Sequence, residues 1–390
     1  MFRWFLNRLY RRSHRSNCRQ AQFVISGTEV INEMKILNVI TSLRTAGAER
    51  LVVDLSRRMA KAGDEVEVLV FDGTRTLFYE ELESAGIKVH SLGIGSRAMH
   101  NPLLAFRFRR FLKRNHYDIV HAHNTPCQVT AAIAAPRRVL VTTEHNTFNR
   151  RRKYAFLRPF DRWMYSRYRH IICVNEETRR ELSRWLRSDK LDARMSVVSN
   201  GIDLDFVMHA KPFHALAADT RFKILMISSF RPQKDHMTLI RAMQYLPEDC
   251  SLTLAGGAEL PAHKAIMADC QQAVVDLGLD DRIHFLGIRR DVAELVKACD
   301  AVVLSSRHEG QPISIIEAMA AGKPVLASDV NGLKDIVGGA GILFPCGDSE
   351  KLAEEIKGLY EDPEKAREIG ARCLERARQF DIGKTADCYR

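Results

Sequence analysis

Two glutamates eight positions apart carry the clearest chemical signal in this sequence. Glu309 and Glu317 lie in segment 306–322, which reads SRHEGQPISIIEAMAAG. A helix is predicted between them, because Pro312 suits its first position and Gly322 the position just past its end. Glu309 then stands just ahead of the helix, where ligands meet the carboxyl ends of strands in open α/β sheets.

The predicted helix places Glu317 on an unexpected face. Ile313, Ile316 and Ala320 recur at helical spacing and are expected to face the core, and Glu317 falls within that apolar stripe. A buried carboxylate is costly unless something hydrogen-bonds it. Two interpretations stay open: a structural ion pair with a nearby basic group, or a hydrogen bond from a ligand hydroxyl.

Two loops hold residue types suited to binding phosphate. The loop at Gly47 follows a predicted strand and opens a predicted helix, so its backbone N–H groups would lie at the positive end of that helix. Arg231 and Lys234 follow another predicted strand, where two cations could clamp a diphosphate and stabilise a leaving group. The dinucleotide fingerprint G-x-G-x-x-G is absent from the sequence, which counts against an NAD-dependent dehydrogenase.

The spacing His121-Ala122-His123 raises the question of a metal site. We expect the two side chains to point to opposite faces of a strand, so that both imidazoles do not reach one ion. One histidine is expected to face a cleft and the other to pack inside.

Composition is typical of a globular protein with two domains. The 390 residues are 46% hydrophobic and 27% charged. No run approaches the roughly 20 apolar residues of a membrane-spanning helix, and no signal peptide is recognised. Nine scattered cysteines without a C-x-x-C pair favour a reducing compartment and argue against a zinc site or a disulfide framework.

Charge is distributed unevenly along the chain. Residues 1–200 contain 36 Lys and Arg against 19 Asp and Glu, a net charge of +17, whereas residues 201–390 contain 23 against 29, a net charge of −6. The basic half indicates an anionic partner, and an anionic membrane surface is favoured because no nucleic-acid-binding motif is found. Residues 1–34 combine arginines with apolar side chains at helical spacing. They are interpreted as an amphipathic membrane helix, a disordered basic tail or an upstream extension.

Strand and helix patterns alternate from Lys35 onward. Strands are predicted at 36–41, 66–71, 119–123, 139–143, 171–174 and 196–199 and, after a linker at 200–221, at 224–228, 252–255, 283–286, 301–305 and 325–327. Helices are predicted at 48–62, 103–114, 176–186, 235–245, 263–277 and 291–298, and within 350–378.

Repeated βα units predict parallel sheets covered on both faces. The fold class is therefore α/β, with two Rossmann-like domains facing a central cleft. The domains are placed at 35–200 and 201–378, after the extension at 1–34, and segment 379–390 is expected to pack back on the first domain.

Together these motifs resemble the retaining glycosyltransferases of the GT-B type, family 4, also called glycosyl transferases group 1. The resemblance covers residues 35–390. It rests on Glu309-x₇-Glu317, Arg231-Pro-Gln-Lys234-Asp, His284-Phe-Leu-Gly287, Ser199-Asn-Gly-Ile-Asp203 and the Gly47 loop. The RPQKDH sequence is similar to that of enzymes that build bacterial surface polysaccharides and lipid-linked oligosaccharides. A GT-B fold is implied, with an acceptor-binding first domain and a second domain that binds the nucleotide-sugar.

The resemblance implies roles for individual residues. Lys234 would bind the donor diphosphate, Glu309 the hydroxyls of the transferred sugar and Glu317 the ribose hydroxyls. The backbone near Gln311, Ile313, Ser314 and Gly47 would meet the phosphates, His123 would line the sugar site, and the backbone at Ile288 would meet the base.

Two positions depart from the family pattern. Ser229 stands where many relatives carry Arg, and Arg231 is the candidate substitute two residues later. Ala46 stands where many relatives carry Gly.

The implied activity is transfer of a hexose or N-acetylhexosamine, with retention, from a nucleotide-sugar. UDP-sugars are the leading candidates, and the acceptor is a hydroxyl of a glycan or lipid-linked glycan in cell-surface polysaccharide synthesis. No metal or other cofactor and no nucleic acid partner is expected. A cytoplasmic location is expected, peripheral on the inner face of the membrane. The alternatives are a nucleotide-sugar epimerase or hydrolase on the same scaffold, and a non-catalytic basic adaptor that binds membrane or nucleic acid.

Overall fold

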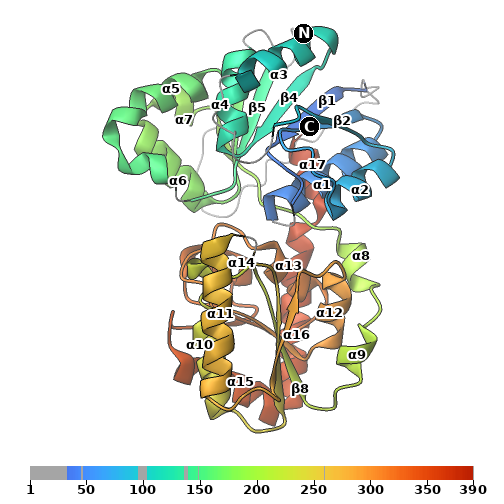
Figure 1. Ribbon diagram of the computed structural model, residues 1–390, viewed down its shortest axis with the longest axis vertical. Coiled ribbons are helices and arrows are strands. Elements are labelled where there is room, and N and C mark those ends of the chain that lie inside the picture. The colour runs from blue at the N-terminus through green and yellow to red at the C-terminus, as the bar shows by residue number, and fades with distance from the viewer. Residues whose placement is uncertain are drawn as a thin grey trace, which may run out of the picture. The chain divides into compact units, whose positions relative to one another are not determined.

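The computed structural model describes residues 33–44, 47–94, 103–135, 139–147, 149–258 and 260–389. The predicted amphipathic segment therefore lies outside the described residues except for its last two positions, and so does Ala46. Residues 34–390 form one contiguous unit. Its strands belong to two parallel sheets (Figure 1).

The first sheet has seven parallel strands in the order β3-β2-β1-β4-β5-β6-β7. Their bounds are β1 Lys35–Ile40, β2 Glu65–Val70, β3 Lys88–Ser91, β4 Ile119–His123, β5 Val139–Glu144, β6 His170–Cys173 and β7 Met195–Val197. In the central strand β1, Val39 pairs with Leu69 on one side and Ala122 on the other. Its side chains are almost all buried, as expected for a parallel strand covered on both faces.

The helices on this sheet have the bounds α1 Gly47–Lys61, α2 Leu77–Ser84, α3 Leu103–Arg114, α4 Thr125–Ala134, α5 Arg158–Ser166, α6 Glu176–Leu186 and α7 Asp189–Asp192, with 3-10 turns η3 Arg150–Lys153 and η4 Ala155–Leu157. The predicted helices 48–62, 103–114 and 176–186 are confirmed within one residue by α1, α3 and α6, and the other helices were not predicted by position. Side chains fix several starts: Asn175 caps α6 by accepting from the Thr178 N–H at 2.7 Å. We call this sheet with its helices the N-terminal lobe.

The second sheet has six parallel strands in the order β10-β9-β8-β11-β12-β13. Their bounds are β8 Phe222–Ile227, β9 Cys250–Ala255, β10 Ile283–Gly287, β11 Ala301–Leu304, β12 Val325–Ser328 and β13 Ile342–Phe344. The helices of this C-terminal lobe are α8 Leu204–Met208, α9 His214–Ala217, α10 His236–Ala242, α11 Pro261–Asp276, α12 Val292–Ala298, α13 Ile313–Ala320, α14 Asn331–Val337, α15 Ser349–Glu361 and α16 Pro363–Ala377, with turns η5 Pro232–Lys234, η6 Met243–Tyr245 and η7 Arg378–Phe380.

Three local expectations were wrong. Segment 200–221 contains α8 and α9, which are too short to show a helical period in the sequence. Strands β3 and β13 were missed because each is a short edge strand with mostly half-exposed side chains. Pro312 caps α13 from outside the helix instead of occupying its first turn, whereas Gly322 ends it with φ +72°, as expected.

The chain returns to the N-terminal lobe at its end. Ile202 donates its N–H to the Phe380 carbonyl, and the Ile382 N–H donates to the Ile202 carbonyl, both at 2.9 Å. Helix α17 (Ile382–Tyr389) then packs against α1, and Figure 1 shows it in red among the blue elements of the first sheet. The boundaries of the two domains stay a prediction.

Candidate functional site

Lys234 and Glu309 meet at the carboxyl ends of neighbouring strands β8 and β11. Lys234 Nζ lies 2.5 Å from Glu309 Oε1, and the two side chains are 15% and 7% exposed. The buried Ser306 hydroxyl donates to the same Oε1 at 2.6 Å. Two donors on one oxygen fix the carboxylate and direct its other oxygen elsewhere.

Backbone contacts hold the two loops that carry this pair together. The Arg307 N–H donates to the Gln233 carbonyl at 2.8 Å, and the Ser305 hydroxyl donates to the Asp235 carbonyl at 2.9 Å. Arg307 Nε donates to Asp235 Oδ2 at 3.2 Å. Asp235 has φ +48°, a left-handed conformation that costs free energy in a residue other than glycine. The surrounding contacts therefore position Lys234 and Glu309 rigidly.

Glu317 faces helix α1 of the other lobe. Ile313, Ile316 and Ala320 are buried as predicted, but Glu317 itself is only half-buried. Desolvation raises the pKa of Glu317 to about 7, the positive charge of Arg50 opposes this rise, and the negative charge of Asp54 adds to it. Arg50 Nε donates to Asp54 Oδ2 at 2.8 Å.

The Glu317 carboxylate has no ion pair or hydrogen bond of its own among the described residues. Arg50 instead pairs with Asp54 and Glu81. A half-buried carboxylate without a direct partner favours the ligand interpretation over the structural ion pair.

The remaining residues predicted to bind phosphate lie where the two lobes meet. A Cβ atom built on Gly47 would lie 4.0 Å from Ile313 Cδ1, so the first residue of α1 faces the first residue of α13. The Gln311 side chain accepts from the Asn200 N–H at 2.6 Å, and Asn175 Nδ2 donates to the Gly310 carbonyl at 2.7 Å. Ser314 is partly exposed on the first turn of α13.

The expectation for His121 and His123 was wrong. Both are buried on the same side of β4, with ring centroids 3.9 Å apart, because residues two apart in a strand share a face. His123 Nδ1 lies 3.1 Å from His145 Nε2, and its Nε2 lies 3.4 Å from Asn38 Oδ1. No group of three His, Cys, Asp or Glu residues in the described part of the chain could hold a metal ion.

Burial keeps this histidine cluster neutral. It lowers the pKa of His121 to about 3 and that of His145 to about 4, and it holds the pKa of His123 well below its ordinary value. A neutral imidazole offers one donor and one acceptor nitrogen. His123 therefore suits hydrogen bonding better than charge stabilisation.

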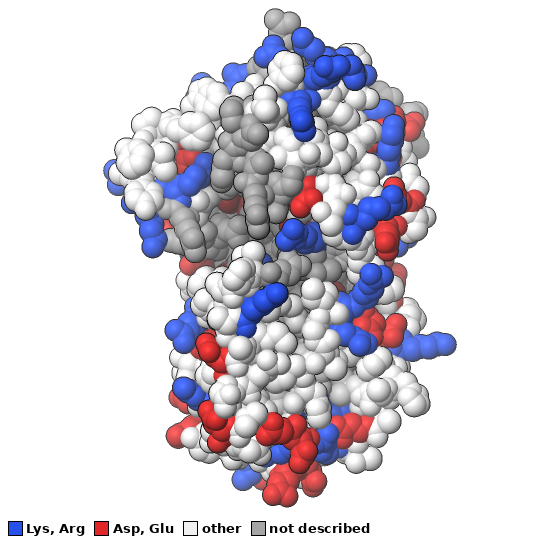
Figure 2. All heavy atoms as spheres, viewed as in Figure 1, with Lys and Arg blue, Asp and Glu red and all other residues white. Residues whose placement is uncertain are grey.

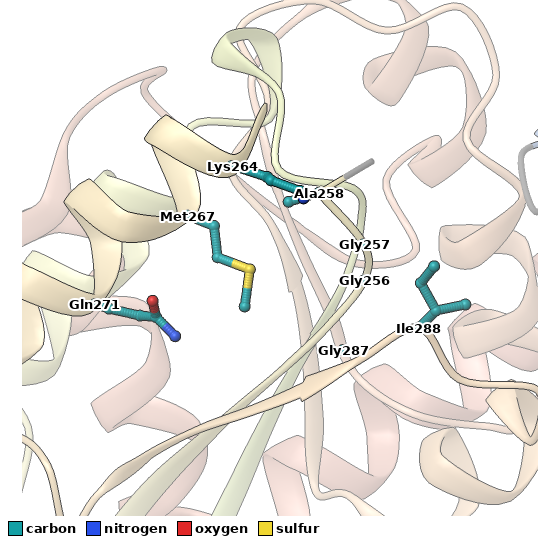
Figure 3. Close-up of a pocket in the computed structure, with 8 residues that line it drawn as sticks. All are labelled: Gly256, Gly257, Ala258, Lys264, Met267, Gln271, Gly287 and Ile288. Carbon is teal, nitrogen blue, oxygen red and sulfur yellow. The ribbon is translucent and has the colours of Figure 1, made fainter. Parts of the chain in front are cut away.

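A hollow of about 720 Å³ opens at the carboxyl ends of β9 and β10. Figure 3 shows Ile288 on one side of the Gly256-Gly257 turn, with Met267 and Gln271 of α11 on the other. A Cβ atom on Gly256 would lie 1.8 Å from the Ser228 carbonyl oxygen, so this approach of two backbone segments requires glycine. Ile288 is 51% exposed at this opening.

Arg231 stands apart from the paired residues. Its side chain is exposed, and its N–H donates to the Ser229 carbonyl at 2.8 Å. The structure thus brings Lys234 to Glu309 and Gly47 to Ile313, and it leaves Arg231 at the surface of the same loop. Sequence reasoning missed Ser306, although a polar residue directly after a buried strand was an available signal.

The architecture matches solved structures of sugar-transferring enzymes. The crystal structure of Anabaena HepE in complex with UDP and glucose matches with a TM-score of 0.80 at 26% identity. The match covers 92% of this chain and 98% of HepE. The two parallel sheets and their helices form a GT-B glycosyltransferase fold.

Two family models match successive parts of the sequence. Glycosyltransferase Family 4 matches residues 45–206, and Glycosyl transferases group 1 matches residues 221–362. The chain belongs to this family of glycosyltransferases and is an enzyme, so the non-catalytic adaptor is set aside.

Relatives of known name agree with this class. The putative glycosyltransferase EpsF of Bacillus subtilis is 28% identical over 318 residues, covering 76% of this chain and 80% of EpsF. The UDP-Gal:alpha-D-GlcNAc-diphosphoundecaprenol alpha-1,3-galactosyltransferase of Escherichia coli is 28% identical over 249 residues, covering 57% of this chain and 60% of that enzyme.

Proposed function

We propose that this enzyme transfers a hexose or N-acetylhexosamine from a UDP-sugar to a hydroxyl of a glycan or lipid-linked glycan, with retention at the anomeric carbon. The observation that carries the proposal is the Lys234–Glu309 pair at the carboxyl ends of β8 and β11. The donor is supported by UDP in the HepE complex and by the UDP-Gal donor of the E. coli relative. That relative's diphosphoundecaprenol acceptor supports a lipid-linked substrate in cell-surface polysaccharide synthesis.

The reaction breaks the bond between the anomeric carbon and the diphosphate oxygen and forms a bond to the acceptor oxygen on the same face of the sugar. The acceptor proton passes to the departing phosphate. Negative charge grows on that phosphate, and Lys234, Arg231 and the backbone N–H groups at the start of α13 would stabilise it.

The two glutamates divide the recognition of the donor. Glu309 has one oxygen bound by Lys234 and Ser306, and its other oxygen would accept from a hydroxyl of the transferred sugar. Glu317 faces α1 without a direct partner of its own among the described residues and would accept from the ribose hydroxyls. The neutral His123 would line the sugar site, and the backbone at Ile288 would meet the base.

The proposal is tested by removing each member of the central pair. Glu309→Ala and Lys234→Ala should each lower kcat/KM for the UDP-sugar about 100-fold or more, while the fold survives. Lys351→Ala and Glu354→Ala are matched controls, because those residues form an exposed ion pair on α15 and should leave turnover unchanged. Undiminished turnover in either site variant would contradict the assignment of Lys234 and Glu309 to the donor site.

Two further measurements test the finer claims. NMR of the product should show the anomeric configuration of the donor, and inversion would contradict retention.

Transfer should persist in excess EDTA, because cations of the protein are proposed to meet the diphosphate charge. Loss of activity that added divalent metal restores would overturn the metal-free proposal. Free sugar or an epimerised nucleotide-sugar as the main product, despite an acceptor, would favour the hydrolase or epimerase alternative.

We further propose a cytoplasmic enzyme that works at the inner face of an anionic membrane. The net charge of +17 on residues 1–200 supports such a partner. No helix among the described residues has the length and apolar character to cross a membrane. Cell fractionation should recover the enzyme partly with membranes and release it in high salt. Recovery only in the soluble fraction at low salt would contradict this location.

A further inference from the structure

Four aromatic side chains are exposed together on the segment that leads into helix α5. Tyr154, Phe156, Phe160 and Trp163 are 55%, 77%, 40% and 42% exposed, and we call them the α5 aromatic patch. Ring centroids of Tyr154 and Phe156 lie 5.9 Å apart, and those of Phe160 and Trp163 lie 5.7 Å apart. An exposed apolar cluster of this kind marks an interaction site in a folded protein.

The opposite face of the same segment is firmly packed. Asp161 is buried, and it accepts from Trp185 Nε1 at 2.9 Å and pairs with Arg151 at 3.0 Å. Met164 and Tyr165 of α5 are also buried. Phe160 and Trp163 are therefore presented by a fixed helix, and Tyr154 and Phe156 by the turn before it, which lowers the entropic cost of binding a partner.

Basic residues surround the patch. Residues 150–169 contain eight Lys and Arg and a single acidic residue, the buried Asp161. Helix α4 packs between α3 and α5. Helix α3 adds Leu103 and Phe106, which are 56% and 65% exposed, among five basic residues. Figure 2 shows Lys and Arg side chains gathered over the part of the molecule that contains α3, whereas Asp and Glu gather near α15.

We propose that the α5 aromatic patch docks the enzyme onto an anionic lipid bilayer. Tyr and Trp prefer the interface between headgroups and acyl chains, and Lys and Arg beside them gain free energy from anionic headgroups. A second copy of the chain is the weaker occupant. In a two-fold dimer the patch would face itself, which would bring the basic residues beside it in one copy against those of the other.

The patch lies on the N-terminal lobe, which the family resemblance assigns to the acceptor. Its segment follows the carboxyl end of β5, where Arg152 lies 3.5 Å from Glu144 and Asn149 Nδ2 donates to Thr125 Oγ1 at 3.1 Å. A bilayer held at the patch would hold a lipid-linked acceptor beside the N-terminal lobe. The inference adds a docking surface to the proposed function, and vesicle binding tests it without any turnover.

The first test is vesicle co-sedimentation of the full chain. Replacing Tyr154, Phe156 and Phe160 together by Ser should weaken partitioning onto phosphatidylglycerol vesicles about tenfold or more, because membrane affinity scales with buried apolar area. The matched control replaces Phe206 and Tyr245, which are 65% and 53% exposed on the C-terminal lobe, by Ser and should bind as the wild type does. Unchanged binding of the triple variant would overturn the proposal, and so would equal binding of the wild type to phosphatidylcholine vesicles.

The second test uses Trp163 as a reporter in the full chain carrying Trp4→Phe. Trp185 is 8% exposed, so Trp163 should supply the change in emission. Anionic vesicles should shift its emission to shorter wavelength, and brominated lipid should quench it. Absence of both effects would overturn the docking geometry. Self-association of the wild type without lipid, lost in the triple variant, would assign the patch to a second copy and overturn the lipid proposal.

Activity separates this inference from the proposed function. The triple variant should retain wild-type turnover with a short water-soluble acceptor, since none of its replaced residues belongs to the donor site. If the wild type itself transfers no sugar while the vesicle results hold, the proposed function fails and the docking surface stands.

Discussion

Lys234 and Glu309 neutralise each other's charge through a direct contact. Their 2.5 Å contact satisfies a carboxylate that is only 7% exposed. On the proposed function, a diphosphate that approaches Lys234 would compete with Glu309 for its positive charge. The Ser306 hydroxyl would keep the carboxylate in place, because it donates to the same Oε1 at 2.6 Å.

This competition leads to a prediction about UDP affinity. Glu309→Gln should bind UDP several-fold more tightly than the wild type, about 1 kcal/mol, because Lys234 no longer has a carboxylate as a competing partner. The same variant should transfer sugar poorly. Titration calorimetry measures the affinity, with Glu350→Gln on exposed α15 as the control. Weaker UDP binding in Glu309→Gln would show that Glu309 does not compete for Lys234.

Glu317 makes stability depend on pH. Its pKa of about 7, against an ordinary value of 4.5, means that the folded state prefers the protonated form. The stability contributed by this proton is complete below pH 4.5 and is lost as the pH rises through 7. Glu317→Gln should therefore gain about 2 kcal/mol of unfolding free energy over the wild type at pH 8, a value reduced for partial solvent contact.

Urea unfolding at pH 8 and pH 5 measures this difference. The gain of Glu317→Gln should shrink toward zero at pH 5, where the wild-type carboxylate is protonated in the folded protein. Glu354→Gln on the exposed face of α15 is the control and should show no such dependence. An equal gain at both pH values would contradict the raised pKa.

Single residues show how far sequence reasoning reaches. Glu309, Lys234 and Gly47 lie at the predicted places in the fold, because motifs mark the carboxyl ends of strands and the starts of helices. Arg50 was not connected to Glu317, because its charge acts across two lobes that are far apart in the sequence. The prediction for His121 was wrong because it placed His121 and His123 on opposite faces of the strand. Residues two apart in a strand share a face.

At the scale of elements, helix α14 packs against the backbone of the loop that carries Glu309. Gly332 in its first turn lies so close to Glu309 and Gly310 that an added Cβ atom would collide with both carbonyl oxygens. The helix can therefore pack directly behind the loop only with glycine at this position. The loop in turn sets the direction of the Glu309 side chain.

Gly332→Ala should push this loop out of place. We expect kcat to fall about tenfold or more, with a loss of roughly 1–3 kcal/mol in unfolding free energy from overpacking. Gly358→Ala is the matched control in α15, where the nearest atom to the new Cβ is the flexible Lys365 Nζ at 3.3 Å. That variant should gain up to about 1 kcal/mol from helix propensity. Normal turnover in Gly332→Ala would show that the loop is not positioned by α14.

Most elements were predictable because long apolar strands and amphipathic helices have distinct periods. Helices α3 and α6 begin and end at the predicted residues. Strands β3 and β13 and the short helices α8 and α9 were not found, since three to five residues with mixed exposure show no reliable period. Cap residues such as Asp203, which accepts from the Phe206 N–H at 3.0 Å, decide such starts locally.

At the scale of the whole molecule, hydrogen bonds join the two lobes near the loop that carries Glu309. Asn175 reaches the Gly310 carbonyl, and Asn331 Nδ2 donates to Glu177 Oε1 at 2.7 Å. Both contacts involve the start of α6, and they tie it to the Glu309 loop and to α14. Closure of this kind protects a bound donor from water.

Asn331→Ala should loosen that closure. The ratio of donor hydrolysis to transfer is expected to rise about two- to fivefold, while stability changes by less than about 0.5 kcal/mol. Free-sugar release with and without acceptor measures the ratio. Asn115→Ala is the control, because Asn115 Nδ2 bonds the Phe111 carbonyl within one lobe. An unchanged ratio would show that this contact does not govern water access.

The return of α17 to the N-terminal lobe also sets the order in which the protein matures. Ala386 and Tyr389 cover Ile36, Leu55 and Met59, which are among the first core residues to be synthesised. These apolar side chains stay uncovered until the whole C-terminal lobe has left the ribosome. Domains that are synthesised earlier commonly fold first. The lobe that is translated first is thus the last to be completed, and its exposed surface in the nascent chain is a natural target for chaperones.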